Sequence, residues 1–127
     1  MEEFPKEQIP DEHDLFMRIH FKHFKDGDIS PIAFRNHDGG MSTNWSNYAD
    51  ALLTKEHAAL LHNKDPNNYG VVELSVGGVR DIPNQEVDHD PLPDNRAHTN
   101  VLGEKDEEAR LKLNELSNWA IPINRPS

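Results

Sequence analysis

The sequence predicts a single α+β domain, with a small mixed or antiparallel sheet of four to five strands and two helices. Its 127 residues suffice for one hydrophobic core but not for two. Segments in which apolar and polar residues alternate, typical of strands, occur in both halves of the chain. Two segments with helical periodicity lie between and after these strands, which gives the order β-β-α-β-(β)-β-α.

The first strand is predicted over residues 15–22. Leu15, Met17 and Ile19 alternate with polar residues and should face the core, so Arg18 and His20 share the opposite face. Residues 1–12 precede this strand and are expected to form a flexible acidic arm, because they hold charges and prolines and little to bury. The domain should span 13–121, and 122–127 should form a tail.

A hairpin and a helix are predicted next. The sequence of residues 25–28 favours a turn, and 29–35 should form a second short strand, although Pro31 indicates an edge or a strand start. After a flexible loop over 36–40, a helix is expected over about 48–62, capped by Ser46 or Asn47. Its expected apolar stripe consists of Tyr48, Leu52, Ala59 and Leu60.

The second half is predicted to hold two strands and one helix. Residues 71–76 have the composition of a central strand, which Gly77 and Gly78 should break. Residues 81–95, with three prolines and five acidic residues, are expected to be a loop. Alternation returns over 96–102, with His98 and Asn100 on one face, and 104–120 should form the last helix.

Composition narrows the classes of function. Thirteen basic against 23 acidic residues give a net charge of −10, which disfavours nucleic acid as a partner. The absence of cysteine excludes disulfides, thiolate nucleophiles and Cys-ligated metals, and fits a cytoplasmic location. Short apolar runs and an acidic start predict neither a membrane span nor an export signal. Basic residues concentrate between Arg18 and Arg35, where any anion site is expected.

The eight histidines raise the question of a metal site. His20, His23, His89, Asp90 and His98 offer suitable ligand atoms, and a metal-dependent hydrolase is one alternative function. However, residues three apart on a strand point to opposite faces, which separates His20 from His23. Surface or hydrogen-bonded histidines are the favoured interpretation, and no metal ligand is assigned.

A second group of residues suits chemistry at the glycosidic bond of NAD. An early arginine can bind phosphate at two points, a hydroxyl can orient the ligand, and a late carboxylate can stabilise positive charge developing on the sugar. We therefore predict Arg18, Ser42 and Glu86 as catalytic residues. The predicted ligand-binding residues are His20, Thr43, His89, Asp90, Arg96 and His98.

This order resembles that of ADP-ribosyltransferase-like domains, including the small RES-type NAD-degrading toxins. The resemblance covers residues 15–90 and rests on three segments: Leu15-Phe16-Met17-Arg18-Ile19, Met41-Ser42-Thr43-Asn44-Trp45-Ser46 and Gln85-Glu86-Val87-Asp88. It implies NAD as the substrate and no further cofactor. Asn44 stands where the family has serine, and Glu86-Val87-Asp88 replaces a Glu-x-Glu or Gln-x-Glu motif.

Other interpretations stay open. The proline-stiffened loop around residues 89–98 could form a site wall, in which Asp88 or Asp90 orients His98 or His20 as a general base. Nucleophile elbows and nucleotide-binding glycine motifs are absent. The non-enzymatic alternative is an acidic module that binds a partner protein through its basic hairpin or through Trp45, Trp119 and Tyr48.

Overall fold

The computed structural model describes residues 4–37 and 39–124. Its strands are β1 (Asp14–His20), β2 (Phe24–Lys25), β3 (Asp28–Ile29), β4 (Met41–Trp45), β5 (Tyr69–Ser75), β6 (Glu86–His89), β7 (His98–Leu102) and β8 (Asn118–Ile121). The α-helices are α1 (Ala51–Leu60), α2 (Val76–Asp81) and α3 (Glu107–Leu116). Short 3₁₀ turns occupy Phe21–His23, Pro31–Ala33 and Pro66–Asn68.

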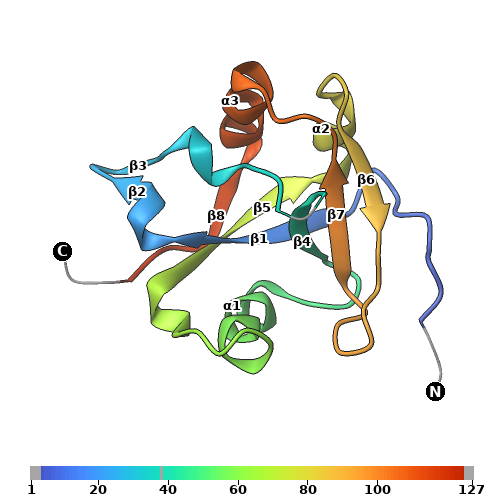
Figure 1. Ribbon diagram of the computed structural model, residues 1–127, viewed down its shortest axis with the longest axis horizontal. Coiled ribbons are helices and arrows are strands. Elements are labelled where there is room, and N and C mark those ends of the chain that lie inside the picture. Colours follow the sequence, from blue (N-terminus) through green and yellow to red (C-terminus); the bar gives the residue numbers. More distant parts are fainter. Residues whose placement is uncertain (1–3, 38, 125–127) are drawn as a thin grey trace.

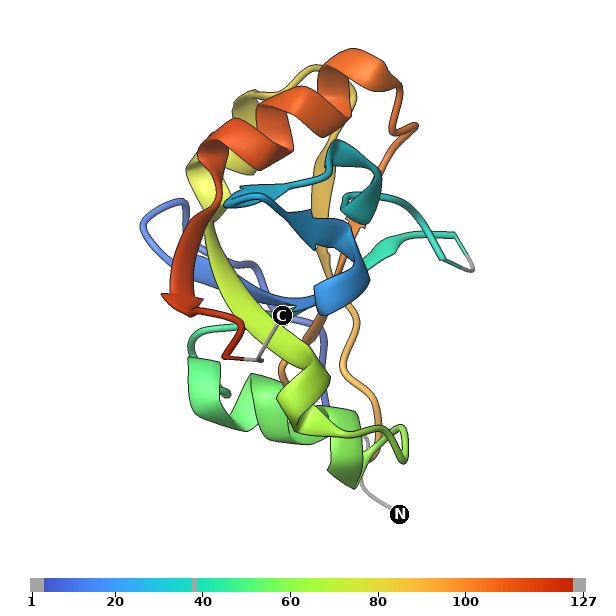
Figure 2. The same ribbon diagram turned by 90° about the vertical axis from the view of Figure 1, so that its left-hand side faces the viewer.

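Six strands form one antiparallel sheet in the order β6-β7-β4-β1-β5-β8, and β2 and β3 form a separate hairpin. Helices α2 and α3 lie on one side of this sheet and α1 lies on the other (Figures 1 and 2). The α+β class is therefore confirmed. The described part of the chain holds six strands in its main sheet and three helices, more than the four to five strands and two helices expected.

The hydrophobic core lies on the α2 and α3 side of the sheet. Leu15, Met17 and Ile19 of β1 are buried there, as their alternation predicted. They pack with residues of β5, α2 and α3, among them Leu74 and Leu113, both 0% exposed. The opposite face of β1 is thereby left to the α1 side, where it carries Arg18.

Several predicted elements need correction. Residues 29–35 do not form a strand: β3 ends at Ile29, and Pro31 begins a 3₁₀ turn, which its fixed φ suits. The stretch 41–45, expected to lead into a helix, is strand β4. The predicted loop 81–95 contains β6, and the predicted helix 104–120 ends at Leu116 and continues as β8.

Gly77 and Gly78 belong to a helix, although they were expected only to break a strand. Ser75 caps α2 by accepting a hydrogen bond from the backbone N–H of Gly78 at 2.9 Å. A Cβ on Gly78 would lie 2.6 Å from both Leu116 and the Ser75 hydroxyl. Glycine at this position therefore permits the close approach of α2 to α3.

Helix α1 differs from its prediction in both its start and its orientation. Asp50 caps it, in place of Ser46 or Asn47, by accepting from the backbone N–H of Leu53 at 2.8 Å. The expected inward residues Leu52 and Leu60 are 56% and 66% exposed. Polar Thr54 and His57 are buried against the sheet instead.

The segment before β1 packs more closely than its composition suggested. Ile9 is 2% exposed and belongs to the core, and Glu7 accepts a hydrogen bond from the Tyr48 hydroxyl at 2.6 Å. Residues 1–3 of the expected arm and 125–127 of the expected tail lie outside the described residues. None of the helices in the described ranges has the length and apolar character that crossing a membrane requires.

Candidate functional site

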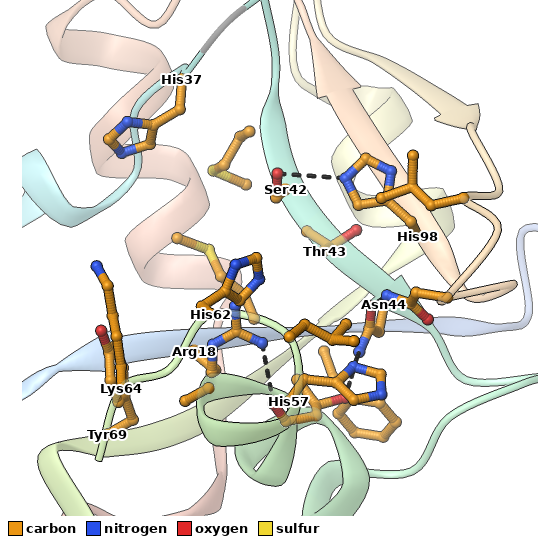
Figure 3. A pocket seen from close by; sticks show the side chains of 18 of the residues that line it. Arg18, His37, Ser42, Thr43, Asn44, His57, His62, Lys64, Tyr69 and His98 are labelled. Carbon is orange, nitrogen blue, oxygen red and sulfur yellow. Dashed lines mark hydrogen bonds between the residues drawn. The ribbon is translucent and has the colours of Figure 1, made fainter. Parts of the chain in front are cut away.

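A cavity of about 370 Å³ lies on the α1 side of the sheet. Its walls come from β1, β4, β7 and α1, together with the segments around residues 33–37, 61–64 and 92–95. Figure 3 shows its side chains: Ser42 and His98 meet on one wall, and Arg18, His57 and His62 gather below them. We call this space the α1 cavity.

The α1 cavity is positively charged within an acidic chain. Its described lining residues include three with permanent positive charge, Arg18, Arg35 and Lys64, against one acidic residue, Asp94. Four histidines add further hydrogen-bond donors and acceptors: His37, His57, His62 and His98. The chain as a whole carries a net charge of −10. This segregation of charge indicates a site for an anion.

The cavity opens where two strands separate. β1 and β4 pair only at Leu15↔Trp45 and Phe16↔Asn44. The same register, continued along both strands, would place Arg18 opposite Ser42, but the two strands do not pair there. Because side chains two residues apart share a face, Arg18 lies with Phe16 and Ser42 lies with Asn44 on the α1 side.

Arg18 holds its charge toward this cavity without an acidic partner. Its Nη1 donates to the Thr54 carbonyl oxygen at 3.0 Å, and its Cζ lies 6.0 Å from the centre of the Tyr69 ring. No ion pair among the described residues involves Arg18. Burial lowers the pKa of Arg18, but a guanidinium stays protonated at neutral pH. An anion in the cavity would therefore find an unneutralised charge.

A chain of hydrogen bonds fixes the buried amide groups beside Arg18. The backbone N–H of Ala97 donates to Asn95 Oδ1 at 3.1 Å, so Asn95 Nδ2 must be the group that donates to Asn44 Oδ1 at 2.8 Å. Asn44 Nδ2 is then left to donate to the Thr54 hydroxyl at 3.1 Å and to His57 Nδ1 at 3.0 Å.

This chain determines the protonation state of His57. An Nδ1 atom that accepts from an amide N–H carries no proton, so the neutral ring bears its proton on Nε2. Burial lowers the pKa of His57, and the positive charge of Arg18 lowers it further. Burial and Arg18 lower the pKa of His62 in the same way. His57 is therefore a neutral hydrogen-bond donor through Nε2, and no proton acceptor is left on its ring.

His98 has the opposite arrangement. Its Nδ1 lies 2.8 Å from the backbone carbonyl oxygen of Asp90, which can only accept, so Nδ1 carries a proton. Its Nε2 lies 3.3 Å from the Ser42 hydroxyl. The Asp90 carboxylate lies 3.6 Å from Nδ1 and accepts from Asn100 Nδ2 at 3.1 Å. A hydroxyl and an imidazole thus lie on the cavity wall, and an aspartate holds the imidazole from behind.

The structure brings five of the predicted site residues together. Arg18, Ser42, Thr43 and His98 line the α1 cavity, and Asp90 holds the ring of His98. The hydroxyl of Thr43 donates to the Thr99 carbonyl oxygen at 2.9 Å, which leaves it no proton for a ligand. Thr43 therefore stabilises the β4–β7 pair.

Four other predicted residues lie elsewhere. Glu86 is exposed opposite Leu102, at the far end of the β6–β7 pair from His98, and does not line the cavity. His20 lines a neighbouring pocket of about 350 Å³. His89 and Arg96 pack on the aromatic cluster of Trp45 and Tyr48, with the Arg96 Cζ 4.2 Å from the centre of the Tyr48 ring.

One residue that was predicted to bind a partner protein, Trp45, is buried. Trp45 is 3% exposed and part of the core. Its ring meets the Tyr48 ring edge to face, and its Nε1 donates to His13 Nδ1 at 2.9 Å. Tyr48 and Trp119 are half-buried. The apolar surface that is most exposed lies on α1, at Leu52 and Leu60.

Several lining residues were not predicted as site residues. Arg35 lies in the basic stretch where an anion site was expected. Asn44, His57, His62 and Lys64 carry no local signal of a site. Of these, His57 lies on the inward face of α1, and that polar face becomes visible only once the helix is placed on the sheet.

Over residues 4–37 and 39–124, no group of three or more histidine, aspartate or glutamate side chains is arranged to hold a metal ion. No protein-family model, curated protein or solved structure matches this chain significantly.

Proposed function

We propose that this domain binds a phosphorylated small molecule in the α1 cavity. The observation that carries the proposal is the half-buried charge of Arg18, which forms no ion pair among the described residues. Keeping a charge in a half-buried site without a counterion is costly, so such a site is expected to take its counterion from a ligand. A guanidinium presents paired donors that match the oxygens of a phosphate.

The surroundings of Arg18 support a phosphate more than a single carboxylate. Arg35 and Lys64 add two further charges to the lining, which suits the higher charge of a phosphate. His57 contributes a neutral N–H donor. A cavity of about 370 Å³ has the size of a small-molecule site.

The cavity continues into a second pocket. The pocket of about 350 Å³ beside it shares Arg35, Lys64 and Tyr69 with the α1 cavity and adds Lys22 and His23. A ligand with two anionic groups could therefore contact both spaces at once. A nucleotide with a diphosphate has this form.

Calorimetric titration of the purified protein with adenosine monophosphate, and with adenosine as the ligand that lacks phosphate, tests the proposal. We expect the nucleotide to bind and the nucleoside to fail. Arg18→Gln should weaken nucleotide binding about 10-fold to 100-fold, the usual loss for a hydrogen bond to a charged group.

Lys112→Gln is the matched control, because it removes one positive charge from an exposed i,i+4 pair on α3, outside the lining of the cavity. Its affinity should equal that of the wild type. Equal nucleotide affinity in the wild type and Arg18→Gln would contradict the proposal, and so would equal binding of nucleoside and nucleotide.

NAD belongs to this class of ligand, and its cleavage stays a prediction. Arg18 and Ser42 both line the cavity, which is compatible with a bound NAD. However, the predicted carboxylate Glu86 does not line it, and Asp94 is the acidic residue among the described lining residues. Nicotinamide release followed by chromatography tests this activity separately from binding.

A further inference from the structure

We infer that Ser42 is a nucleophile that attacks the phosphorus of a bound phosphate ester, with His98 as its general base. This inference rests on the proposed function, because it takes the phosphate in the α1 cavity as the reacting group. The sequence predicted Ser42 as a catalytic residue and His98 as one candidate base, but it did not pair the two, since Ser42 lies on a strand and not in a nucleophile elbow.

The first support is the protonation of His98. Its Nδ1 carries the proton that it donates to the Asp90 carbonyl oxygen, so the neutral ring has its lone pair on Nε2. That atom lies 3.3 Å from Ser42 Oγ. The hydroxyl is the only member of this pair that can donate, and it therefore points its proton at the base. This is the arrangement that activates a serine.

The second support is the way in which the ring of His98 is held. Asp90 contacts it with both its carbonyl and its carboxylate, and Asn100 holds that carboxylate at 3.1 Å. Asn100 in turn lies opposite Ser42 in the β4–β7 pair. A Cβ at Gly40 would lie 3.0 Å from the Asn100 side chain, so glycine leaves room for it. Asp90 and Asn100 are positioning residues.

The third support is the contrast between the rings of His57 and His98. The network of Asn44 uses the Nδ1 lone pair of His57, which cannot then act as a base. His98 keeps its acceptor free for Ser42. Of the histidines in this cavity, His98 is therefore the one that the hydrogen bonds prepare to receive a proton from a hydroxyl.

The fourth support is the position of Ser42 relative to positive charge. It lies on the same face of the sheet as Arg18 and in the same cavity, which also contains Arg35 and Lys64. A phosphate bound by Arg18 would therefore lie in a space that Ser42 also lines. Cations around a phosphoryl group stabilise the charge that it carries in the transition state.

The reaction is a hydrolysis in two steps. Ser42 Oγ bonds to phosphorus while the bond from phosphorus to the alcohol oxygen breaks. The serine proton passes to His98 Nε2 and then to the departing alcohol. Water next attacks the phosphoserine, His98 accepts a proton from it, and the bond between phosphorus and Oγ breaks as the proton returns to Ser42. The products are phosphate and the free alcohol, and the only co-reactant is water.

A fluorophosphonate probe tests the nucleophile directly, because attack by an activated serine expels fluoride and leaves a stable adduct on its oxygen. After incubation with the full chain, digestion and mass spectrometry locate the label. We expect it on Ser42 and not on Ser46, a serine of the same region whose Oγ accepts a backbone hydrogen bond at 3.2 Å. Excess inorganic phosphate should slow the labelling.

His98→Gln should slow labelling of Ser42 by about 100-fold or more, the usual contribution of a general base. His13→Gln is the matched control, because it removes an imidazole that lines neither the α1 cavity nor the pocket beside it. Its labelling rate should equal that of the wild type. Thermal unfolding confirms that each variant is folded, and if His98→Gln does not fold, the phosphate competition on the wild type decides.

The outcomes separate this inference from the proposed function. Nucleotide binding with an unlabelled Ser42 would overturn the nucleophile and leave the binding proposal standing. Equal labelling of Ser42 and Ser46, or a rate unchanged in a folded His98→Gln, would also overturn it. Labelling of Ser42 that depends on His98 in a protein that binds no phosphate would overturn the phosphate ester as substrate.

Discussion

Single hydrogen bonds decide what His57 and His98 of the α1 cavity can do. The backbone N–H of Ala97 fixes which way the amide of Asn95 is oriented. That amide fixes the orientation of Asn44, which in turn donates to the ring of His57. If His57 were protonated at Nδ1, its N–H would face the amino group of Asn44, donor against donor. This opposition adds to the burial and the nearby Arg18 charge that lower the pKa of His57.

Asn44→Asp should reverse this effect. An aspartate oxygen can accept from Nδ1, and its negative charge favours the imidazolium, so the pKa of His57 should rise from its lowered value toward or above the usual 6.5. Nitrogen NMR of the imidazole rings over a pH titration measures both the pKa and the protonated nitrogen. His23, which does not line the α1 cavity, is the internal reference. An unchanged His57 titration would contradict the proposed hydrogen-bond chain.

The sequence predicted those site residues that follow from alternation along one strand. Arg18 was placed on the polar face of β1 because Leu15, Met17 and Ile19 had to face the core. Glu86 could not be placed in this way. Its position depends on the register of β6 against β7, which sets it opposite Leu102 and away from the cavity. Register between distant strands has no local signal in a short, acidic segment.

At the scale of elements, α1 turns polar residues toward the sheet and two of its leucines toward solvent. Its leucines at 52 and 60 face solvent, while Thr54 and His57 face the sheet. Burying two polar side chains is tolerated because both are hydrogen-bonded to Asn44. The periodicity of apolar residues predicted the opposite face, since a sequence pattern cannot show that the sheet offers polar partners. A helix that lines a polar cavity can therefore depart from the usual rule that the apolar face is the buried one.

Two leucines therefore differ in their contribution to stability. Leu60→Gln should change the free energy of unfolding by no more than about 0.5 kcal/mol, because Leu60 is 66% exposed. Leu113→Ala in α3 should cost about 2–5 kcal/mol, because Leu113 is 0% exposed in the main core. Urea unfolding of the two variants measures both values. A large loss at Leu60 would mean that α1 presents its apolar face to the protein.

Some strands can be predicted from their own residues, whereas others depend on the strand with which they pair. β1 and β5 were predicted because their composition and alternation are strong, and they pair along seven residues from Asp14↔Ser75 to His20↔Tyr69. Most of β8, by contrast, was predicted as the end of the last helix. Its residues Asn118–Ile121 become a strand only by pairing with β5, where the sheet offers a free edge.

At the scale of the whole molecule, charge is separated between the cavity and the rest of the chain. The net charge of −10 disfavours a polyanion on the surface, whereas the α1 cavity gathers Arg18, Arg35 and Lys64. The prediction against nucleic acid from net charge does not extend to a small phosphorylated ligand. Such a ligand needs only the local field of the cavity, which the low surrounding dielectric strengthens.

Three histidines couple the stability of the domain to pH. Burial and neighbouring positive charges lower the pKa values of His23, His57 and His62 below the usual 6.5. As the pH falls below that value, the unfolded chain takes up protons before the folded protein does. The contribution of these residues to folding is therefore undiminished above the usual pKa and is lost progressively below it.

Acidification from about pH 7.5 to about pH 5.5 should accordingly lower the midpoint of thermal unfolding of the free protein. Phosphate should oppose this loss, because an anion in the α1 cavity favours protonation of His57 and His62, and by linkage it then binds more tightly at the lower pH. Calorimetric melts at both pH values, with and without excess phosphate, measure the two effects. Arg18→Gln should retain the pH dependence and lose most of the rescue. Sulfate keeps its charge over this pH range, so stabilisation by sulfate that stays the same at both pH values would show that these histidines do not face the bound anion.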